Sequence, residues 1–164
     1  MSEKIKWKGG TLLAPVPAVM VSCGSLEKPN VLTIAWTGIL CTNPPKTYIS
    51  VRPERFSYPL IKESGKFVIN LTTEQLVRAA DFCGVRSGRD IDKFAACGLT
   101  PEEPEAVSVP GILQCPLTLE CKVLYRREQD PALIPQDILD KAYGPQGDYH
   151  TVYYGEIVSA YEIT

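Results

Sequence analysis

Short apolar runs that end at turn residues dominate the first half of the chain and restrict the folds it can adopt. Residues 17–23 and 31–40 are rich in β-branched and aromatic side chains, which predicts two strands. Pro44 and Pro45 end the second strand because proline has no backbone N–H for a sheet ladder. A third strand is predicted at 47–51, so we expect three strands before any helix.

The remaining elements follow from periodicity and helix-end signals. They are a helix at 57–64 with Ser57 as its N-cap, a strand at 66–71, a helix that opens at 72–75 and ends at Gly84, a short helix that ends at Gly98, strands at 117–125 and 151–163, and a single helical turn around 138–141. Residues 98–111 are rich in Pro and Glu and read as a surface connection. Helices are inserted without regular alternation, which favours a mainly β fold, an antiparallel barrel with helical insertions. No G-x-G-x-x-G follows a strand, which argues against a Rossmann domain.

Length and charge narrow the class of protein. A chain of 164 residues with 45% hydrophobic content is expected to form one domain over residues 1–164. Its formal charge of −2 gives no broad positive field, so neither nucleic acid nor an anionic membrane is an expected partner. No apolar run reaches the roughly 20 residues of a membrane span, and residues 1–10 lack the apolar stretch of a secretory signal. We therefore expect a cytoplasmic location.

Cysteine is common in this sequence, and the six residues are Cys23, Cys41, Cys83, Cys97, Cys115 and Cys121. No two have the C-x-x-C spacing that places two thiolates on one ion, so no metal site is predicted. We expect reduced thiols that mostly act as small buried hydrophobic groups. The alternative use of these residues is a thiol-based or metal-based sensor.

The most informative local pattern is Arg52-x-x-Arg55-x-Ser57, where a predicted strand leads into a helix. Two guanidinium groups beside the free N–H groups and hydroxyl of a helix N-terminus suit a phosphomonoester. The alternative is that both arginines pair with surface carboxylates such as Glu54 and Glu63.

Three further positions carry chemical hypotheses, each with a structural alternative. Trp36, near the hydroxyls of Thr33 and Thr37, fits one wall of a slot for a planar ring, or is a core tryptophan. Lys93 fits a cation beside the pyrimidine end of a flavin, or an exposed partner of nearby aspartates. His150, the single histidine, fits a proton donor or nicotinamide contact, or a solvated loop residue.

Taken together, these motifs resemble the flavin reductase-like family, especially its flavoredoxin branch, over nearly the whole chain. The matching segments, in order, are Thr33-x-x-Trp36-Thr37-Gly38, Ser50-Val51-Arg52-Pro53-x-Arg55-x-Ser57, Phe67-Val68-x-Asn70, Cys83-Gly84-x-x-Ser87-Gly88-Arg89-Asp90-x-Asp92-Lys93-Phe94 and Tyr154-Gly155-Glu156-Ile157. The resemblance implies a split β-barrel that forms a homodimer and binds FMN, or alternatively FAD, in a groove at or near the subunit interface.

The resemblance also implies roles for individual residues. The ring or its linker would lie along Thr33, Trp36 and Thr37, and the phosphate would be held by Arg52, Arg55 and Ser57. A loop closing over the isoalloxazine would contribute Cys83, Gly84, Ser87 and Lys93. Ser50 and Asn70 belong to the same motifs and complete the predicted cofactor-binding set.

Tyr149 interrupts a motif that the family associates with nicotinamide nucleotides. Many family members have Gly-Asp-His in this place, whereas this chain has Gly147-Asp148-Tyr149-His150. The leading hypothesis is an NAD(P)H:flavin reductase-like enzyme, with His150 as its catalytic residue and electrons passed to a partner oxygenase or another acceptor. The second hypothesis is an electron carrier that holds FMN tightly, exchanges electrons with a redox-protein partner and does not turn over NAD(P)H.

Overall fold

The computed structural model describes residues 18–163. Pro17, which we predict in the first strand, and residues 1–10, which bear on the predicted location, lie outside the described part. Within residues 18–163, no helix has the length and apolar character needed to cross a membrane.

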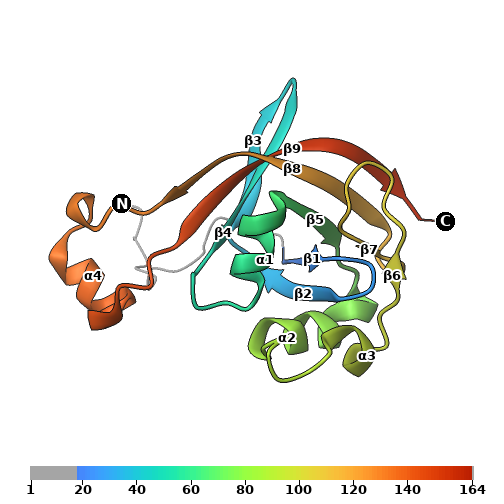
Figure 1. The fold of residues 1–164 in the computed structure, drawn as a ribbon, viewed down its shortest axis with the longest axis horizontal. Coiled ribbons are helices and arrows are strands. Elements are labelled where there is room, and N and C mark those ends of the chain that lie inside the picture. The colour runs from blue at the N-terminus through green and yellow to red at the C-terminus, as the bar shows by residue number, and fades with distance from the viewer. Residues whose placement is uncertain (1–17, 164) are drawn as a thin grey trace, which may run out of the picture.

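A curved antiparallel sheet of seven strands forms the body of the protein (Figure 1). In sheet order these strands are β2 (Pro29–Ile34), β1 (Val19–Gly24), β5 (Lys66–Leu71), β8 (Leu117–Glu128), β9 (Thr151–Glu162), β4 (Pro45–Val51) and β3 (Thr37–Thr42). A second, two-stranded sheet pairs β6 (Pro101–Glu102) with β7 (Gly111–Ile112). The predicted mainly β fold is confirmed.

The two edge strands of the main sheet are neighbours in the sequence. Only Ala35 and Trp36 separate the end of β2 from the start of β3, and two residues span less than about 10 Å even when extended. The sheet must therefore curl until its two edges meet at this link. A backbone hydrogen bond from Ser50 N to the Trp36 carbonyl, 3.0 Å long, ties the link to β4.

Alternation along β1 separates two hydrophobic layers. Val19 and Val21 face the inside of the barrel, where they pack with Phe67, Tyr153 and Ile61. Ile61 belongs to α1 (Ser57–Ser64), so this helix closes one end of the interior.

The outer face of β1 and β2 carries the second layer. Met20 and Val31 pack there against Ala80 of α2 (Val77–Val85) and Phe94 of α3 (Lys93–Cys97). Figure 1 shows both helices beneath β2. A 3-10 helix at Glu74–Leu76 precedes α2. Helix α2, together with Lys93 at the start of α3, provides one wall of a cavity at the end of β2.

Strands β8 and β9 continue beyond the barrel as a long ribbon with bulges at Glu120/Cys121 and Val123/Tyr125. The ribbon supports an insertion at residues 129–149, which contains α4 (Gln136–Ala142) and 3-10 helices at Pro131–Leu133 and Gly144–Gln146. Figure 1 places this α4 insertion at one end of the molecule.

Several predicted boundaries are wrong for identifiable reasons. The apolar run at 31–40 forms two strands because the chain crosses between sheet edges at Ala35 and Trp36, so four strands precede the first helix. Thr72 does not cap a helix, since its hydroxyl donates to the Ala18 carbonyl. Gly84 lies inside α2.

Four other predictions also differ from the structure. The connection after Gly98 is not wholly at the surface, because Val109 is fully buried against β5. The predicted helical turn at 138–141 is the longer α4, and β8 runs three residues past its predicted end at 125. Ser57 does not cap α1, because it is the first residue inside the helix and Phe56 takes the N-cap position; the Ser57 hydroxyl accepts from a side chain on β2.

We expect Gly155→Ala to reduce the free energy of unfolding by about 1–3 kcal/mol. A Cβ at Gly155 would lie 2.6 Å from Cζ of Phe67 and 3.2 Å from Cβ of Cys121, and both neighbours are fully buried. Urea denaturation of the variant measures the loss. Because Phe67→Leu removes the obstructing ring atoms, the double variant should lose less than the sum of the two single losses. Strict additivity would contradict this explanation.

Candidate functional site

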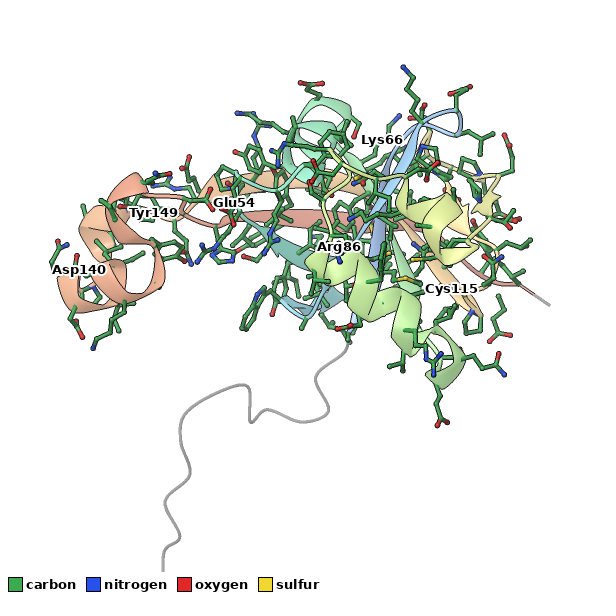
Figure 2. All side chains as sticks on the ribbon, turned by 90° about the horizontal axis from the view of Figure 1, so that it is seen from below. Glu54, Lys66, Arg86, Cys115, Asp140 and Tyr149 are labelled. Atoms are coloured by element: carbon green, nitrogen blue, oxygen red, sulfur yellow. The ribbon has the colours of Figure 1, made fainter. Side chains whose placement is uncertain are left out.

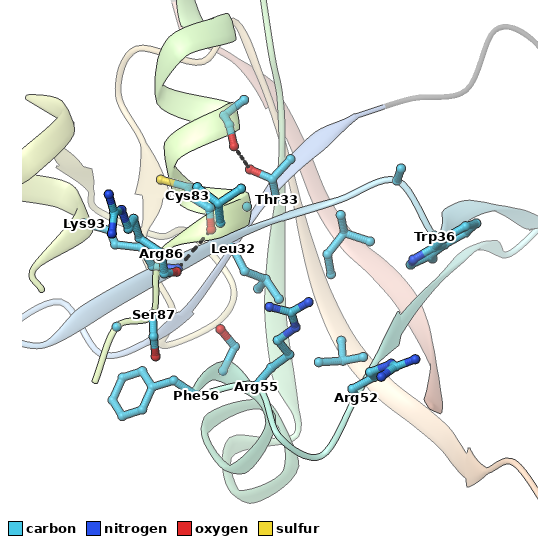
Figure 3. A pocket seen from close by; sticks show the side chains of 18 of the residues that line it. Leu32, Thr33, Trp36, Arg52, Arg55, Phe56, Cys83, Arg86, Ser87 and Lys93 are labelled. Carbon is cyan, nitrogen blue, oxygen red and sulfur yellow. Dashed lines mark hydrogen bonds between the residues drawn. The ribbon is translucent and has the colours of Figure 1, made fainter. Parts of the chain in front are cut away.

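A cavity of about 1020 Å³ lies at the link where the two sheet edges meet (Figure 3). Its walls come from the end of β2, the end of β4 with the start of α1, and α2 with the loop that follows it. The volume is at the upper end of the range for small-molecule sites. The cavity can hold a ligand as large as a mononucleotide.

Most of the residues predicted from sequence line this one cavity. They are Thr33, Trp36, Ser50, Arg52, Arg55, Ser57, Cys83, Gly84, Ser87, Lys93 and His150. Two predicted residues do not. The Thr37 hydroxyl donates to the Tyr48 carbonyl within the β3–β4 pair, and the fully buried Asn70 amide bonds Met20 O, Ser22 Oγ and Ile112 N. The Thr37 side chain therefore stabilises the β3–β4 pair, and the Asn70 side chain joins β5 to β1 and to β7.

Positive charge is concentrated around the cavity although the chain as a whole is slightly acidic. The cationic side chains in its lining are Arg52, Arg55, Arg86, Arg89 and Lys93. The carboxylates in the lining are Glu54 and Asp81. Five cations against two carboxylates, close together in a concave site, favour an anionic ligand.

Ser57 is positioned by a buried asparagine. The Asn30 amide on β2 donates to Ser57 Oγ at 2.7 Å and to Cys23 Sγ at 3.4 Å. Because Ser57 Oγ accepts this bond, its own proton is available to an acceptor in the cavity. Gly88 allows the loop after α2 to approach Asn30 and Ser57, since a Cβ at Gly88 would lie 2.2 Å from Asn30 Oδ1.

The two arginines of the predicted phosphate motif differ in their surroundings. Arg52 Nη2 donates to the Ala142 carbonyl at 2.7 Å, and the guanidinium lies 5.0 Å from the Tyr143 ring centroid. Arg52 Nη1 also lies 3.9 Å from Asp148 Oδ2. Among the described residues, no hydrogen bond or ion pair of the Arg55 guanidinium is found, and Figure 3 shows this group pointing into the cavity. Arg55 is therefore the freer of the two to bind an anion.

Lys93 is buried, which contradicts the alternative that it is an exposed partner of nearby aspartates. Its Nζ donates to the Cys83 carbonyl at 3.2 Å and to the Arg86 carbonyl at 3.3 Å. Both carbonyls lie at the C-terminal end of α2, where a cation is favoured by the helix dipole. Burial lowers the pKa of Lys93. One N–H of the ammonium group stays available beyond these two bonds.

Trp36 and Thr33 line the cavity in different ways. The Trp36 side chain is 55% exposed, which excludes the core alternative within this chain. Its ring lies at the opposite end of the cavity from Lys93 in Figure 3. The Thr33 hydroxyl donates to the Ala80 carbonyl, so it fixes α2 against β2 and its oxygen faces the cavity only as an acceptor.

His150 enters the cavity from the start of β9 and is held by the α4 insertion. Its Nδ1 lies 2.9 Å from the Tyr143 hydroxyl, and that hydroxyl donates to Gln129 Oε1. Since the only phenolic proton is used on Gln129, Nδ1 is the donor and Nε2 of the neutral ring is left as an acceptor. Burial, followed by the charge of Arg52, lowers the pKa of His150.

The same insertion contacts the phosphate motif. Asp148 Oδ1 accepts from the backbone N–H of Glu54 at 2.9 Å. In Figure 2, Glu54 and Tyr149 lie where the α4 insertion meets the main body of the molecule. Contacts from the α4 insertion, which lies outside the barrel, thus hold residues 52–55 in place.

We expect the His150 imidazole to titrate below its usual value of about 6.5, so that it is neutral at pH 7. Removing a nearby cation favours the protonated ring, so Arg52→Ala should raise the midpoint. The histidine ring protons report this directly by NMR because the chain has one histidine. Arg78→Ala, which removes an exposed arginine outside the cavity, should leave the midpoint unchanged. A midpoint at or above 6.5 would contradict the assignment.

Sequence reasoning missed three contributors to the site. Asn30 is a buried residue of β2, and its partner Ser57 is 27 residues away. Arg86 and Arg89 line the cavity, and Arg89 Nη2 donates to the Glu54 carbonyl at 2.8 Å. The Ser87-Gly88-Arg89 stretch was an available signal for Arg89. No local pattern marks Asn30 or Arg86.

A curled antiparallel sheet, with a cationic cavity of mononucleotide size where its two edges meet, defines the class as a β-barrel protein with a site suited to an anionic ligand. The sequence matches the flavin reductase like domain over residues 12–164, and the chain belongs to that family. The fold is therefore the split barrel predicted from the sequence motifs.

Individual relatives agree with this assignment. The flavoredoxin of Desulfovibrio vulgaris (Miyazaki F) is 30% identical with a TM-score of 0.78, covering 98% of this chain and 76% of that one. An FMN-binding domain of a flavin reductases-like enzyme from Shewanella baltica is 26% identical with a TM-score of 0.69, covering 92% and 71% of the two chains. An uncharacterised protein of Archaeoglobus fulgidus is 33% identical over 80% of this chain and 75% of its own.

Proposed function

We propose that this protein binds FMN in the cavity and works as a flavin-dependent oxidoreductase of the flavin reductase-like type. The observation that carries the proposal is the grouping of Arg55, Ser57 and Lys93 around one cationic cavity of mononucleotide size. FAD, with an additional adenosine phosphate, is the alternative flavin. Residues 1–164 act as one flavin-binding domain in this proposal.

The phosphate would be held by Arg55 and Ser57. Arg55 supplies a guanidinium with no other partner among the described residues, and Ser57 supplies a hydroxyl proton oriented by Asn30. The first turn of α1 contains no acidic side chain that would repel an anion. Arg52 adds charge, while its bonds to the α4 insertion fix the loop.

The ring would lie between Trp36 and the wall formed by Lys93, Cys83, Gly84 and Ser87. Bound FMN would supply two-electron chemistry, accepting a hydride at N5 and passing electrons onward. Lys93 would stabilise negative charge that develops on the ring, because its buried cation acts in a medium that screens little. Ser50 and Thr33 would pack along the cofactor, and Thr37 and Asn70 act only through the sheet.

His150 is the proposed catalytic residue of NAD(P)H oxidation. Its Nε2 acceptor and neutral ring suit a contact with a nicotinamide carboxamide rather than proton donation. The role is therefore orientation of the donor for hydride transfer.

The second candidate function is electron transfer by tightly bound FMN without NAD(P)H turnover. It is favoured by the similarity to a flavoredoxin and by Tyr149, which interrupts the Gly-Asp-His order. The final electron acceptor would be a redox protein in this case, and a partner oxygenase or another acceptor in the first.

An absorbance spectrum of the purified chain, followed by FMN titration, tests the shared proposal. We expect flavin bands or saturable FMN uptake, and the absence of both would exclude flavin binding. Steady-state oxidation of NADH and NADPH with added flavin then separates the two functions. Turnover supports the reductase, whereas retained FMN without turnover supports the carrier.

We also propose a homodimer. The edge strand β3 exposes Ile39 and Leu40 beside the exposed Trp36, and a row of apolar side chains on an open sheet edge invites pairing. Sedimentation equilibrium should give twice the chain mass. Ile39→Lys should shift the protein to monomer, and Leu133→Lys, on an exposed apolar residue of the α4 insertion outside the cavity, should not.

A further inference from the structure

Two thiols meet where α2 approaches α3. Cys83 Sγ and Cys97 Sγ lie 3.9 Å apart in a thiol–thiol hydrogen bond, although the residues are 14 positions apart in the sequence. All six cysteines are within the described residues, and no other pair makes such a contact. This pair therefore differs chemically from the other four thiols.

The geometry needs only a small change to form a disulfide. An S–S bond is about 2.05 Å long, so the sulfurs must approach by about 2 Å. Cys97 is the last residue of α3, a helix of five residues, and its side chain is half-buried. Forming the bond therefore requires a rotation of the Cys97 side chain or a shift of this short helix.

The two thiols also differ in access. Cys83 is buried and lines the cavity, whereas Cys97 reaches solvent. Burial raises the pKa of Cys83 to about 12, and Cys97 adds to this effect. Cys83 is thus a protonated thiol at neutral pH, and Cys97 is the sulfur that a dissolved oxidant meets first.

We propose that Cys83 and Cys97 are a dithiol modification site at which a hydroperoxide forms an intramolecular disulfide. The Cys97 sulfur attacks the peroxide O–O bond, which forms a sulfenic acid and releases one water when the oxidant is hydrogen peroxide. The Cys83 sulfur then attacks the Cys97 sulfur, the S–O bond breaks, and the Cys83 thiol proton passes to the departing hydroxyl group, which leaves as the second water. Overall, two thiols are oxidised by two electrons, and one peroxide is reduced to two waters.

The site goes beyond the proposed flavin chemistry and does not depend on it. The disulfide links α2, the part of the cavity wall that contains Cys83, to α3. A thiol reductant restores both thiols by exchange. Reduced flavins that meet dioxygen are one source of hydrogen peroxide near such a site.

The test treats the reduced full-length chain with hydrogen peroxide, blocks free thiols with iodoacetamide, and maps the peptides by mass spectrometry. We expect a single disulfide that joins the Cys83 and Cys97 peptides, two fewer alkylated thiols, and full recovery with dithiothreitol. The same mapping on chain saturated with FMN should give the same pair.

Variants make the result specific. Cys97→Ser should abolish the loss of two thiols, while Cys41→Ser should not, because Cys41 is equally half-buried and its sulfur contacts only the Asn43 carbonyl. In Cys83→Ser, Cys97 should stop at the sulfenic acid, which dimedone labels. A disulfide between other cysteines, or Cys97 oxidised beyond sulfenic acid with Cys83 still free, would overturn the proposal, as would no reaction.

Discussion

Arg55→Ala is expected to weaken FMN binding by about 10- to 100-fold, the equivalent of roughly 1.5–3 kcal/mol for a lost charge-assisted hydrogen bond. The Arg55 guanidinium lines the cavity and has no other partner among residues 18–163, so its removal leaves no other group of the protein unpaired. Quenching of flavin fluorescence on titration measures the dissociation constant.

Riboflavin provides the matched ligand control because it lacks the phosphate. Its affinity should be equal for the wild-type chain and Arg55→Ala. Arg78→Ala, an exposed arginine outside the cavity, should change neither affinity. An equal loss of affinity for FMN and riboflavin would show that Arg55 acts on a part of the flavin other than the phosphate. An unchanged FMN affinity would show that the phosphate binds elsewhere.

Glu120→Ala should lower the free energy of unfolding by about 3–5 kcal/mol, a large part of the 5–15 kcal/mol typical of a domain. The fully buried Glu120 carboxylate accepts from the backbone N–H groups of Glu105, Ala106 and Val107 at 2.6, 2.6 and 2.9 Å. Without the carboxylate, these three N–H groups lose their partner, and the loop that contains residues 105–107 is no longer held on β8. Urea denaturation measures the change.

Two variants make this prediction specific. Glu128→Ala removes an exposed carboxylate at the other end of β8 and should change stability by less than about 0.5 kcal/mol. Glu120→Gln keeps one acceptor but turns an amide donor toward a backbone donor, so its loss should fall between the two. A Glu120→Ala variant as stable as Glu128→Ala would contradict the anchoring role.

Sequence patterns predicted those parts of the molecule that depend on near neighbours. The strand-like runs, the prolines that end them and the glycine at the end of α3 act over a few residues, so the mainly β fold was predictable. The proximity of Arg55 to Ser57 was predictable for the same reason, because both lie in a short connection from a strand to a helix. The ordered motifs then predicted the family.

Other features of the site depend on partners that are distant in the sequence. Trp36 lies at a strand break that exists only because the sheet curls until its edges meet. Arg52, a predicted phosphate ligand that lines the cavity, also donates to a carbonyl 90 residues away. Lys93 is buried because the end of α2 offers it two carbonyls. None of these partners is visible in local periodicity.

The sequence alone therefore determined the strand content, the approximate elements and the cationic motif of the cavity. Tertiary structure decided which arginine is free, which asparagine orients Ser57, and that Cys83 meets Cys97. The physical reason is that turn and strand preferences are set by neighbouring residues. Hydrogen bonds and thiol contacts between distant segments form only when packing brings those segments together.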